Sequence, residues 1–198
     1  FAFTDSHWFN AVEAEVYAFS TFFTAIVVWL ILKWNEKADE IGNERYILII
    51  AYMIGLATGL HLLNLLAIPF IALIIYFKKY EPSWKTFGYT VTITGIVFFL
   101  IHNVIIKGMP KIADSIGVWG AACLVLSVFV FMIWAIKNQK LILSLSLTSM
   151  VLILIGYSTY ALIFIRSNQD PGIDENDPET IEAFISYLER EQYGDVGI

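Results

Sequence analysis

The stretch that decides the fold is YILIIAYMIGLATGLHLLNLLAIPFIALIIYF, which runs from Tyr46 to Phe77 without an Asp, Glu, Lys or Arg. As one α-helix it would extend about 48 Å, well beyond a hydrocarbon core of roughly 30 Å. Its middle carries Gly59, His61 and Asn64, and Pro69 follows a turn later. We therefore predict that the stretch breaks there into two short membrane spans.

The rest of the chain has the composition of a membrane protein. Apolar residues make up 58% and charged residues 15% of the sequence, whereas soluble domains have about 45–50% and about 25%. The net charge of −6 offers no basic patch for nucleic acid. Further uncharged runs that suit one span each are Val16–Leu32, Thr86–Ile106, Ser115–Ile136 and Leu141–Ile165. We predict an all-α, polytopic transmembrane helix bundle of about six spans.

The distribution of Lys and Arg supports the break. With six spans, one side of the membrane carries Lys33, Lys37, Arg45, Lys78, Lys79, Lys85, Lys137 and Lys140. Only Lys107 and Lys111 remain in an outer loop, which we expect around His102-Asn103 and Lys107–Pro110. With Tyr46–Phe77 as one span, the bias disappears. The positive-inside rule then places both ends of the sequence outside the cytoplasm.

The composition of the chain changes from apolar to acidic after Ile165. We divide it into a membrane bundle, residues 1–165, and an acidic extracytoplasmic tail, residues 166–198, with nine acidic residues and two arginines. Asp177-Pro178-Glu179 predicts a helix start. An apolar stripe follows at Ile181, Phe184, Ile185 and Leu188. We predict a short amphipathic helix over Asp177–Tyr193, packed at the outer face of the bundle.

Two carboxylates precede the first span. Glu13 and Glu15 lie about 200° apart on a helix, so both cannot face one cleft. One interpretation is that both lie at headgroup depth and favour the helix N-terminus. The other is that Glu15, beside Tyr17, points into a polar cavity.

His61 and Asn64 would share one helical face if the helix continued that far. They form either a capped turn with its hydrogen bonds satisfied inside the bundle or the lining of an outer cleft, in which His61 contacts a ligand. No further His, Cys or acid lies at ligand spacing, so we predict no metal site. Gly55 and Gly59 form a small-xxx-small pair that favours helix packing.

Arg166 follows the last span directly. It is either an interfacial anchor whose side chain snorkels to the headgroups or a guanidinium that holds a phosphate through two hydrogen bonds. The single cysteine, Cys123, allows neither an intrachain disulfide nor a thiolate cluster. No phosphate-binding loop, zinc-binding helix or catalytic-triad pattern is present, so spacing alone indicates no reaction.

Three separated segments resemble one family in the same order. They are the stretch from His7-Trp8-Phe9 to Tyr17, the stretch Gly55–Pro69, and Ile165–Pro171 with Asp174–Pro178 and Arg190–Asp195. The family comprises bacterial multi-span membrane proteins, long of unknown function. It is related to the animal transmembrane protein O-mannosyltransferase and is similar in architecture to GT-C glycosyltransferases, which use polyprenyl-phosphate sugars. The resemblance implies a bacterial inner-membrane protein.

The resemblance also implies missing parts. Family members begin earlier, with a Trp-Asp-x-Gly-Glu string and a His-Pro-Pro-Gly string, and neither occurs in this sequence, which opens at Phe1. We therefore expect an internal fragment that is inactive alone, with the main catalytic base upstream and Glu15 as the candidate within the sequence. The positions that the resemblance carries over as substrate-binding are Tyr17, His61, Asn64 and Arg166.

The resulting hypothesis is sugar transfer from a polyprenyl-phosphate donor to a protein hydroxyl on the outer face. The expected partners are membrane lipid, the lipid-linked sugar and an acceptor protein, without nucleic acid, and no cofactor beyond the sugar donor is implied. Glu15, His61, Asn64 and Arg166 are predicted to line one outward-facing cavity. The alternative is a transporter or a non-catalytic scaffold subunit. A transporter would place polar groups at mid-depth in broken helices.

Overall fold

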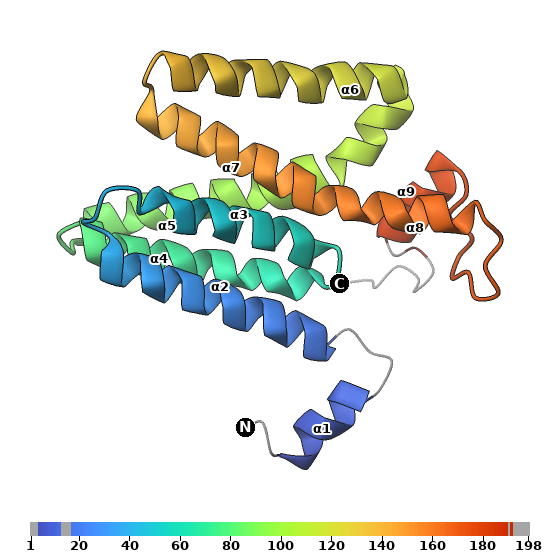
Figure 1. Cartoon of the computed structure of the whole chain (residues 1–198), viewed down its shortest axis with the longest axis horizontal. Helices are drawn as coiled ribbons and strands as arrows, with labels where there is room; N and C mark the ends of the chain where they lie inside the picture. Colours follow the sequence, from blue (N-terminus) through green and yellow to red (C-terminus); the bar gives the residue numbers. More distant parts are fainter. Residues whose placement is uncertain (1–3, 13–16, 190, 192–198) are drawn as a thin grey trace. The chain divides into compact units, whose positions relative to one another are not determined.

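The computed structural model describes residues 4–12, 17–189 and 191, and the regular elements within them are helical (Figure 1). In chain order they are α1 (Asp5–Val12), α2 (Tyr17–Lys37), α3 (Glu44–Thr58), the 3-10 helix η1 (Leu62–Leu66), α4 (Ala67–Lys79), α5 (Trp84–Phe99), the π-helix η2 (Leu100–Ile106), α6 (Gly108–Lys137), α7 (Leu141–Tyr157), the 3-10 helix η3 (Ser158–Tyr160), α8 (Ala161–Ser167) and α9 (Ile181–Glu189). The predicted all-α class is confirmed.

Several helices have the dimensions of membrane spans. Within the described residues, five helical stretches are long and apolar enough to cross a membrane: Tyr17–Lys37, Leu62–Lys79, Trp84–Ile106, Trp119–Lys137 and Leu141–Ser167. These stretches make the protein a polytopic transmembrane helical protein. The remaining candidate, α3, has 15 residues and a length of about 22 Å. A sixth span at α3 therefore stays a prediction.

The helices group into two compact units. The first comprises Phe1–Phe98 with Thr148–Tyr157, and the second comprises Phe99–Leu147 with Ser158–Ile198. Each unit has its own packing. The boundary between bundle and tail at residue 165 was drawn on charge, and it stays a prediction.

In the first unit the chain folds back inside the stretch Tyr46–Phe77, as predicted. The helix α3 ends at Thr58, and the backbone at His61 is extended, with φ −157° and ψ 128°. The short helix η1 and α4 then follow, and both α3 and α4 pack against α2 (Figure 1). The prediction of a break between Gly59 and Leu66 is confirmed.

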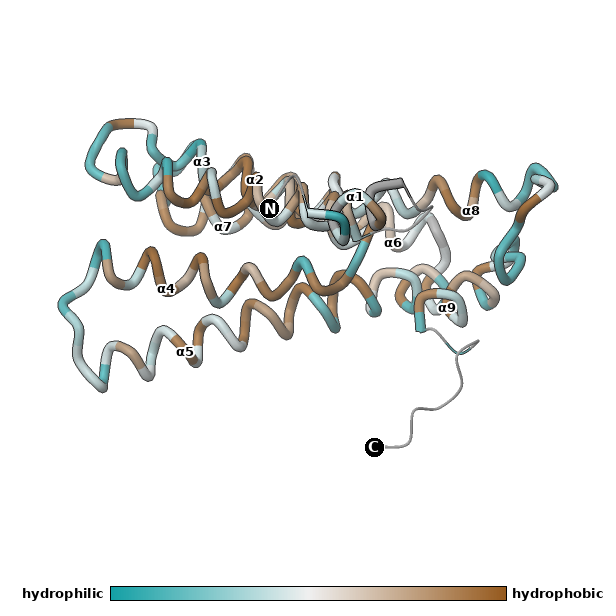
Figure 2. Tube along the Cα trace, turned by 90° about the horizontal axis from the view of Figure 1, so that it is seen from below, coloured by the Kyte–Doolittle hydropathy of each residue, from teal (hydrophilic) through white to brown (hydrophobic). Residues whose placement is uncertain are grey.

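The turn between α2 and α3 is tied to the end of α4. The indole Nε1 of Trp34 donates to Oδ1 of Asn43 at 3.0 Å. The ammonium of Lys79 donates to the carbonyl oxygen of Ala38 at 2.8 Å and to Asp39 at 3.2 Å. Figure 2 shows hydrophilic residues at this turn and at the turn from α4 to α5. Within the first unit, α2 and α4 therefore end at the same side, and α3 runs back from it.

Close backbone contact joins α3 to the first part of α7. A Cβ atom added at Gly55 would lie within 3.0 Å of backbone atoms of Ile153, and one at Gly156 would lie 2.7 Å from the carbonyl oxygen of Tyr52. Glycine at both positions lets the two backbones touch. The packing role predicted for Gly55 is confirmed, but its partner is Gly156. Gly59 follows α3, and its N–H bonds back to the carbonyl of Leu56.

In the second unit, the expected outer loop around Lys107–Pro110 is wrong. The π-helix η2 contains His102 and Asn103, and α6 begins directly after Lys107. Proline is tolerated in the first turn of a helix, because the N–H groups there have no intrahelical partner, and Pro110 occupies that turn. The break comes later, at Gly117, whose φ of 75° and ψ of 161° lie outside the helical region.

The tail helix is present but begins later than predicted. Asp177 has a left-handed φ of 46° rather than the extended backbone typical of an N-cap, and α9 begins at Ile181. The hydroxyl of Thr180 caps the helix by accepting from the N–H of Ala183 at 3.1 Å. The residues of the predicted apolar stripe are half-buried, and the ring of Phe184 meets that of Phe164 edge-on at 6.0 Å. The predicted end of this helix lies outside the described residues.

Candidate functional site

The predicted site residues fall into three groups. Glu13 and Glu15 lie outside the described residues, so the structure adds nothing to the candidate base. Tyr17, His61 and Asn64 belong to the first unit, where the chain reverses between α3 and α4. Arg166 belongs to α8 of the second unit. The single cavity expected to contain all of these residues therefore stays a prediction.

Asn64 holds the reversal together. Its amide oxygen accepts from the hydroxyls of Ser20 at 3.1 Å and Thr24 at 2.8 Å, both on α2. Its amide nitrogen donates to the carbonyls of Ala57 at 3.1 Å and His61 at 3.0 Å. An asparagine side chain has two donor hydrogens and two acceptor lone pairs, and these four hydrogen bonds use all of them. Asn64 therefore positions the turn, and contact with a substrate through its amide would require breaking one of these bonds.

Ser20 and Thr24 are not among the site residues predicted from the sequence. They lie one turn apart on the same face of α2, and a pair of hydroxyls in an apolar span is the signal that could have identified them. The signal does not name their partner, because Asn64 lies 40 or more positions away along the chain.

One ring nitrogen of His61 is engaged in a hydrogen bond within the turn. Its Nδ1 accepts from the N–H of Leu63 at 3.2 Å and thereby caps η1. A neutral imidazole carries one proton, so this bond places that proton on Nε2. Among the described residues, no group hydrogen-bonds to Nε2, and the side chain is half-buried. His61 therefore offers a fixed N–H donor at the surface of the turn.

Tyr17 lies beside this donor. Its ring centroid is 5.7 Å from that of His61, with the planes tilted by 45°, and the residue is 52% exposed. Within the described part of the chain, its hydroxyl has no hydrogen-bond partner. The two side chains together present an N–H and an O–H, which suit an anionic oxygen ligand such as a phosphate.

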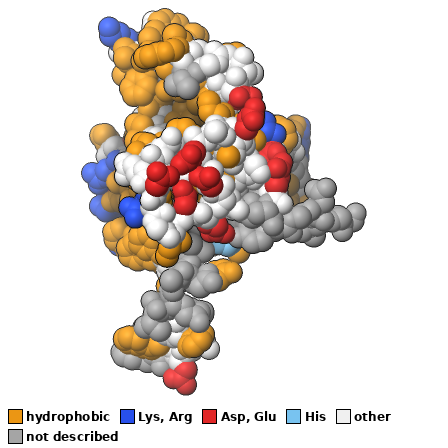
Figure 3. All heavy atoms as spheres, turned by 90° about the vertical axis from the view of Figure 1, so that its right-hand side faces the viewer, with side chains coloured by type: hydrophobic (Ala, Val, Ile, Leu, Met, Phe, Trp, Pro, Cys, Tyr) orange, Lys and Arg blue, Asp and Glu red, His pale blue; other side chains and the backbone are white. Residues whose placement is uncertain are grey.

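Arg166 ends the last predicted span, at a place rich in carboxylates. Its guanidinium is exposed and has no ion-pair or hydrogen-bond partner among the residues that the structure describes. The next residue, Ser167, is buried and donates to Asp174 at 2.7 Å. Figure 3 shows Asp and Glu side chains gathered on the face formed by the segment after α8. Repulsion by Asp177, reinforced by partial desolvation and other nearby acids, raises the pKa of Glu179. The surroundings of Arg166 are therefore acidic.

The described residues hold no cluster of three or more His, Cys, Asp or Glu side chains arranged to bind a metal ion.

Comparison with known proteins identifies a relation for the first part of the chain. Residues 1–84 match the family model described as the Protein O-mannosyl-transferase TMEM260 N-terminal domain. The match supports a relation to the animal O-mannosyltransferase, as the resemblance implies. It contains Tyr17, His61 and Asn64 but not Arg166. No curated protein and no solved structure matches the chain.

Proposed function

We propose that this chain is part of a membrane glycosyltransferase that moves a sugar from a polyprenyl-phosphate donor to a protein hydroxyl. The family match over residues 1–84 supports a glycosyltransferase-like membrane protein. The donor, the acceptor and a GT-C mechanism follow from the resemblance. The observation that carries the proposal is the free Nε2 donor of His61 beside the hydroxyl of Tyr17.

The bonds that break and form in the proposed reaction determine which chemical groups the site must supply. The bond from the anomeric carbon of the sugar to the phosphate oxygen breaks, and a bond from that carbon to the acceptor oxygen forms. The acceptor hydroxyl loses its proton to a base, and negative charge develops on the departing lipid phosphate. His61 and Tyr17 would donate to that phosphate, and Asn64 would hold His61 in place. Glu15 stays the candidate base within the sequence, and Arg166 the candidate cation.

The proposed orientation follows from charge. The turns after α2 and α4 carry Lys37, Lys78 and Lys79, and both belong to the same side of the first unit. The positive-inside rule assigns that side to the cytoplasm. The turn at His61 would then face outward, in a bacterial inner membrane, with both ends of the sequence extracytoplasmic.

The transporter alternative expects polar groups at mid-depth in a broken span. In the first unit the break is instead the turn between two antiparallel helices, and the amide of Asn64 is fully bonded within it. This arrangement gives no support to transport. A scaffold subunit remains the alternative that the transfer assay must decide.

The test is sugar transfer by the full-length protein from a polyprenyl-phosphate mannose to an acceptor peptide. His61→Asn keeps an oxygen that can cap η1 but removes the Nε2 donor. Loss of one hydrogen bond to a charged group raises the free energy of the transition state by about 1.5–3 kcal/mol. The rate of transfer would then fall roughly ten- to a hundredfold. Tyr17→Phe and Glu15→Gln complete the series.

The matched control is Leu63→Ala, an exposed neighbour whose side chain is placed in no site. We expect the control to retain wild-type transfer. Wild-type rates in His61→Asn would refute the role of the imidazole. The absence of transfer by the unmodified protein, in the presence of correctly inserted protein and several polyprenyl-phosphate sugars, would instead favour the scaffold alternative.

A further inference from the structure

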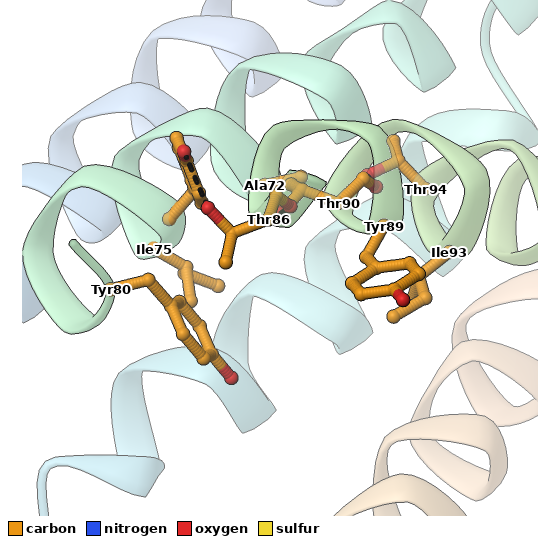
Figure 4. Close-up of a pocket in the computed structure, with 9 residues that line it drawn as sticks. Ala72, Ile75, Tyr80, Thr86, Tyr89, Thr90, Ile93 and Thr94 are labelled. Atoms are coloured by element: carbon orange, nitrogen blue, oxygen red, sulfur yellow. Dashed lines mark hydrogen bonds between the residues drawn. The ribbon is translucent and has the colours of Figure 1, made fainter. Parts of the chain in front are cut away.

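A groove lies between α4 and α5 in the first unit, away from the turn at His61. Its volume is about 440 Å³, and it is lined by Ala72, Ile75, Tyr76, Tyr80, Thr86, Tyr89, Thr90, Ile93 and Thr94 (Figure 4). The volume is within the range of about 300–1,000 Å³ that is typical of small-molecule sites. From Tyr80 at the turn to Ala72, the groove follows α4 for about 12 Å. It therefore runs from the lysine-bearing end toward the middle of two predicted spans.

The body of the groove is suited to an apolar occupant. The hydroxyls of Thr90 and Thr94 donate to backbone carbonyls one turn earlier, at 3.0 and 2.7 Å. The hydroxyl of Tyr76 is bonded to Thr86 at 3.0 Å and to the turn at Ser83. The hydrogens of these hydroxyls are already engaged, so the body of the groove offers an occupant no free hydroxyl donor from these three residues. Hydrocarbon fits this part of the groove.

The helix α5 leaves the groove open. Although it is described in full, it has no buried residue. Trp84, at its first position, is 91% exposed, and tryptophan at the end of a span is typical of the headgroup region. The mouth of the groove therefore lies at headgroup depth, and its body lies among the acyl chains.

Residues of both charges lie next in sequence to lining residues at the turn end of the groove: Glu81 follows Tyr80, and Lys85 precedes Thr86. Asp39 pairs with Lys78 and Lys79 at 3.2 Å each, which engages those two lysines. Lys85 and Glu81 are exposed, and neither has an ion-pair partner among the described residues. Lys85 precedes Tyr89 by one turn of α5, so its long side chain can reach the groove.

Tyr80 lies at the turn end of the groove, and Tyr89 lies farther along it, beside Ile93 (Figure 4). In the described part of the chain, neither phenol hydroxyl has a hydrogen-bond partner, and the residues are 59% and 58% exposed. A cation, a carboxylate and the phenol of Tyr80 complement a headgroup that carries both a phosphate and an ammonium group.

We propose that this groove binds one zwitterionic glycerophospholipid, with an acyl chain between α4 and α5. The phosphate lies at Lys85 and the phenol of Tyr80, and the ammonium of an ethanolamine headgroup lies at Glu81. The site is separate from the turn at His61, and its occupation does not depend on sugar transfer.

The first test is the lipid that stays bound to the full-length protein after purification in mild detergent, measured by native mass spectrometry. Ala72→Phe and Ile93→Trp fill the groove, and Val91→Trp is the control because Val91 is exposed and does not line the groove. We expect about tenfold less bound phosphatidylethanolamine in the filled variants, equivalent to roughly 1.4 kcal/mol, and no change in the control. Equal retention in all three variants would overturn the proposal.

The second test concerns the headgroup. In mixed vesicles, a phosphatidylethanolamine with a diazirine in its acyl chain should label peptides of α4 and α5, and the unlabelled lipid should compete better than phosphatidylglycerol. Lys85→Ala should lower the labelling, and Lys140→Ala, an exposed lysine of the second unit, should not. Glu81→Ala should shift the preference toward phosphatidylglycerol. Preference of the wild type for phosphatidylglycerol, or labelling that is insensitive to Lys85→Ala, would contradict the headgroup assignment.

Discussion

The two ends of the first unit are held by opposite means. At the end with His61, one buried neutral amide, that of Asn64, joins α2, η1 and the end of α3 through four hydrogen bonds. At the lysine-bearing end, the exposed Asp39 pairs with Lys78 and Lys79. Buried polar groups are costly to leave unbonded, whereas exposed ion pairs contribute little. The comparison predicts that the fold depends strongly on the first end and weakly on the second.

The largest effect is expected for Asn64→Ala. The change leaves the hydroxyls of Ser20 and Thr24 and two backbone carbonyls without their partner, so we expect a loss of about 3 kcal/mol in the free energy of unfolding. Thermal or denaturant unfolding of the detergent-solubilised protein measures it. Leu63→Ala is the control, since that side chain is exposed at the same turn. A loss no larger than that of Leu63→Ala would show that the fold does not depend strongly on the amide of Asn64.

Thr24→Val should have an intermediate effect. It keeps the shape of the side chain and removes one of the two hydroxyls that donate to Asn64, so we expect a loss of about 1 kcal/mol. In an Asn64→Ala background the same change should cost much less, because the partner is already gone. Additive losses in the double variant would show that the two residues do not act through each other.

The smallest effect is expected for Asp39→Asn. Hydrogen bonds and attraction from Lys78 and Lys79 lower the pKa of Asp39 in the folded protein. Its contribution is therefore present above the pKa of the unfolded chain and is lost as the pH falls through the lowered folded value. Because the group is exposed, added salt should screen the pairs. We expect unfolding at neutral pH to change within experimental error, and a loss as large as that of Asn64→Ala would reverse the comparison.

Parts of this architecture follow from sequence because they depend on local length and hydropathy. The break in Tyr46–Phe77 is one example, since a helix of that length does not fit one crossing. The contact of Gly55 with Gly156 and the bonds of Asn64 to Ser20 and Thr24 depend on which helices become neighbours, and periodicity within one helix does not contain that information.

Both wrong predictions rest on a short residue pattern that is compatible with more than one backbone conformation. Lys107–Pro110 has the composition of a loop, yet a proline in a first helical turn is compatible with α6. Asp177 and Pro178 have the pattern of a helix start, but the left-handed backbone at Asp177 moves the start to Ile181. Tyr17, His61 and Asn64 lie together at one turn, but their roles in a site stay predictions. The roles of Glu15 and Arg166 stay predictions.

The central claim is that the turn at His61 and the turn after α4 open on opposite sides of the membrane, with His61 outside. The most direct measurement is labelling of intact cells with a membrane-impermeant thiol reagent. The full-length protein would carry Cys123→Ser and any cysteines elsewhere would be replaced, with Leu63→Cys or Glu81→Cys added singly. The account predicts that Leu63→Cys is labelled from outside and that Glu81→Cys is labelled only after the cells are permeabilised. Labelling of both positions from the same side would contradict it.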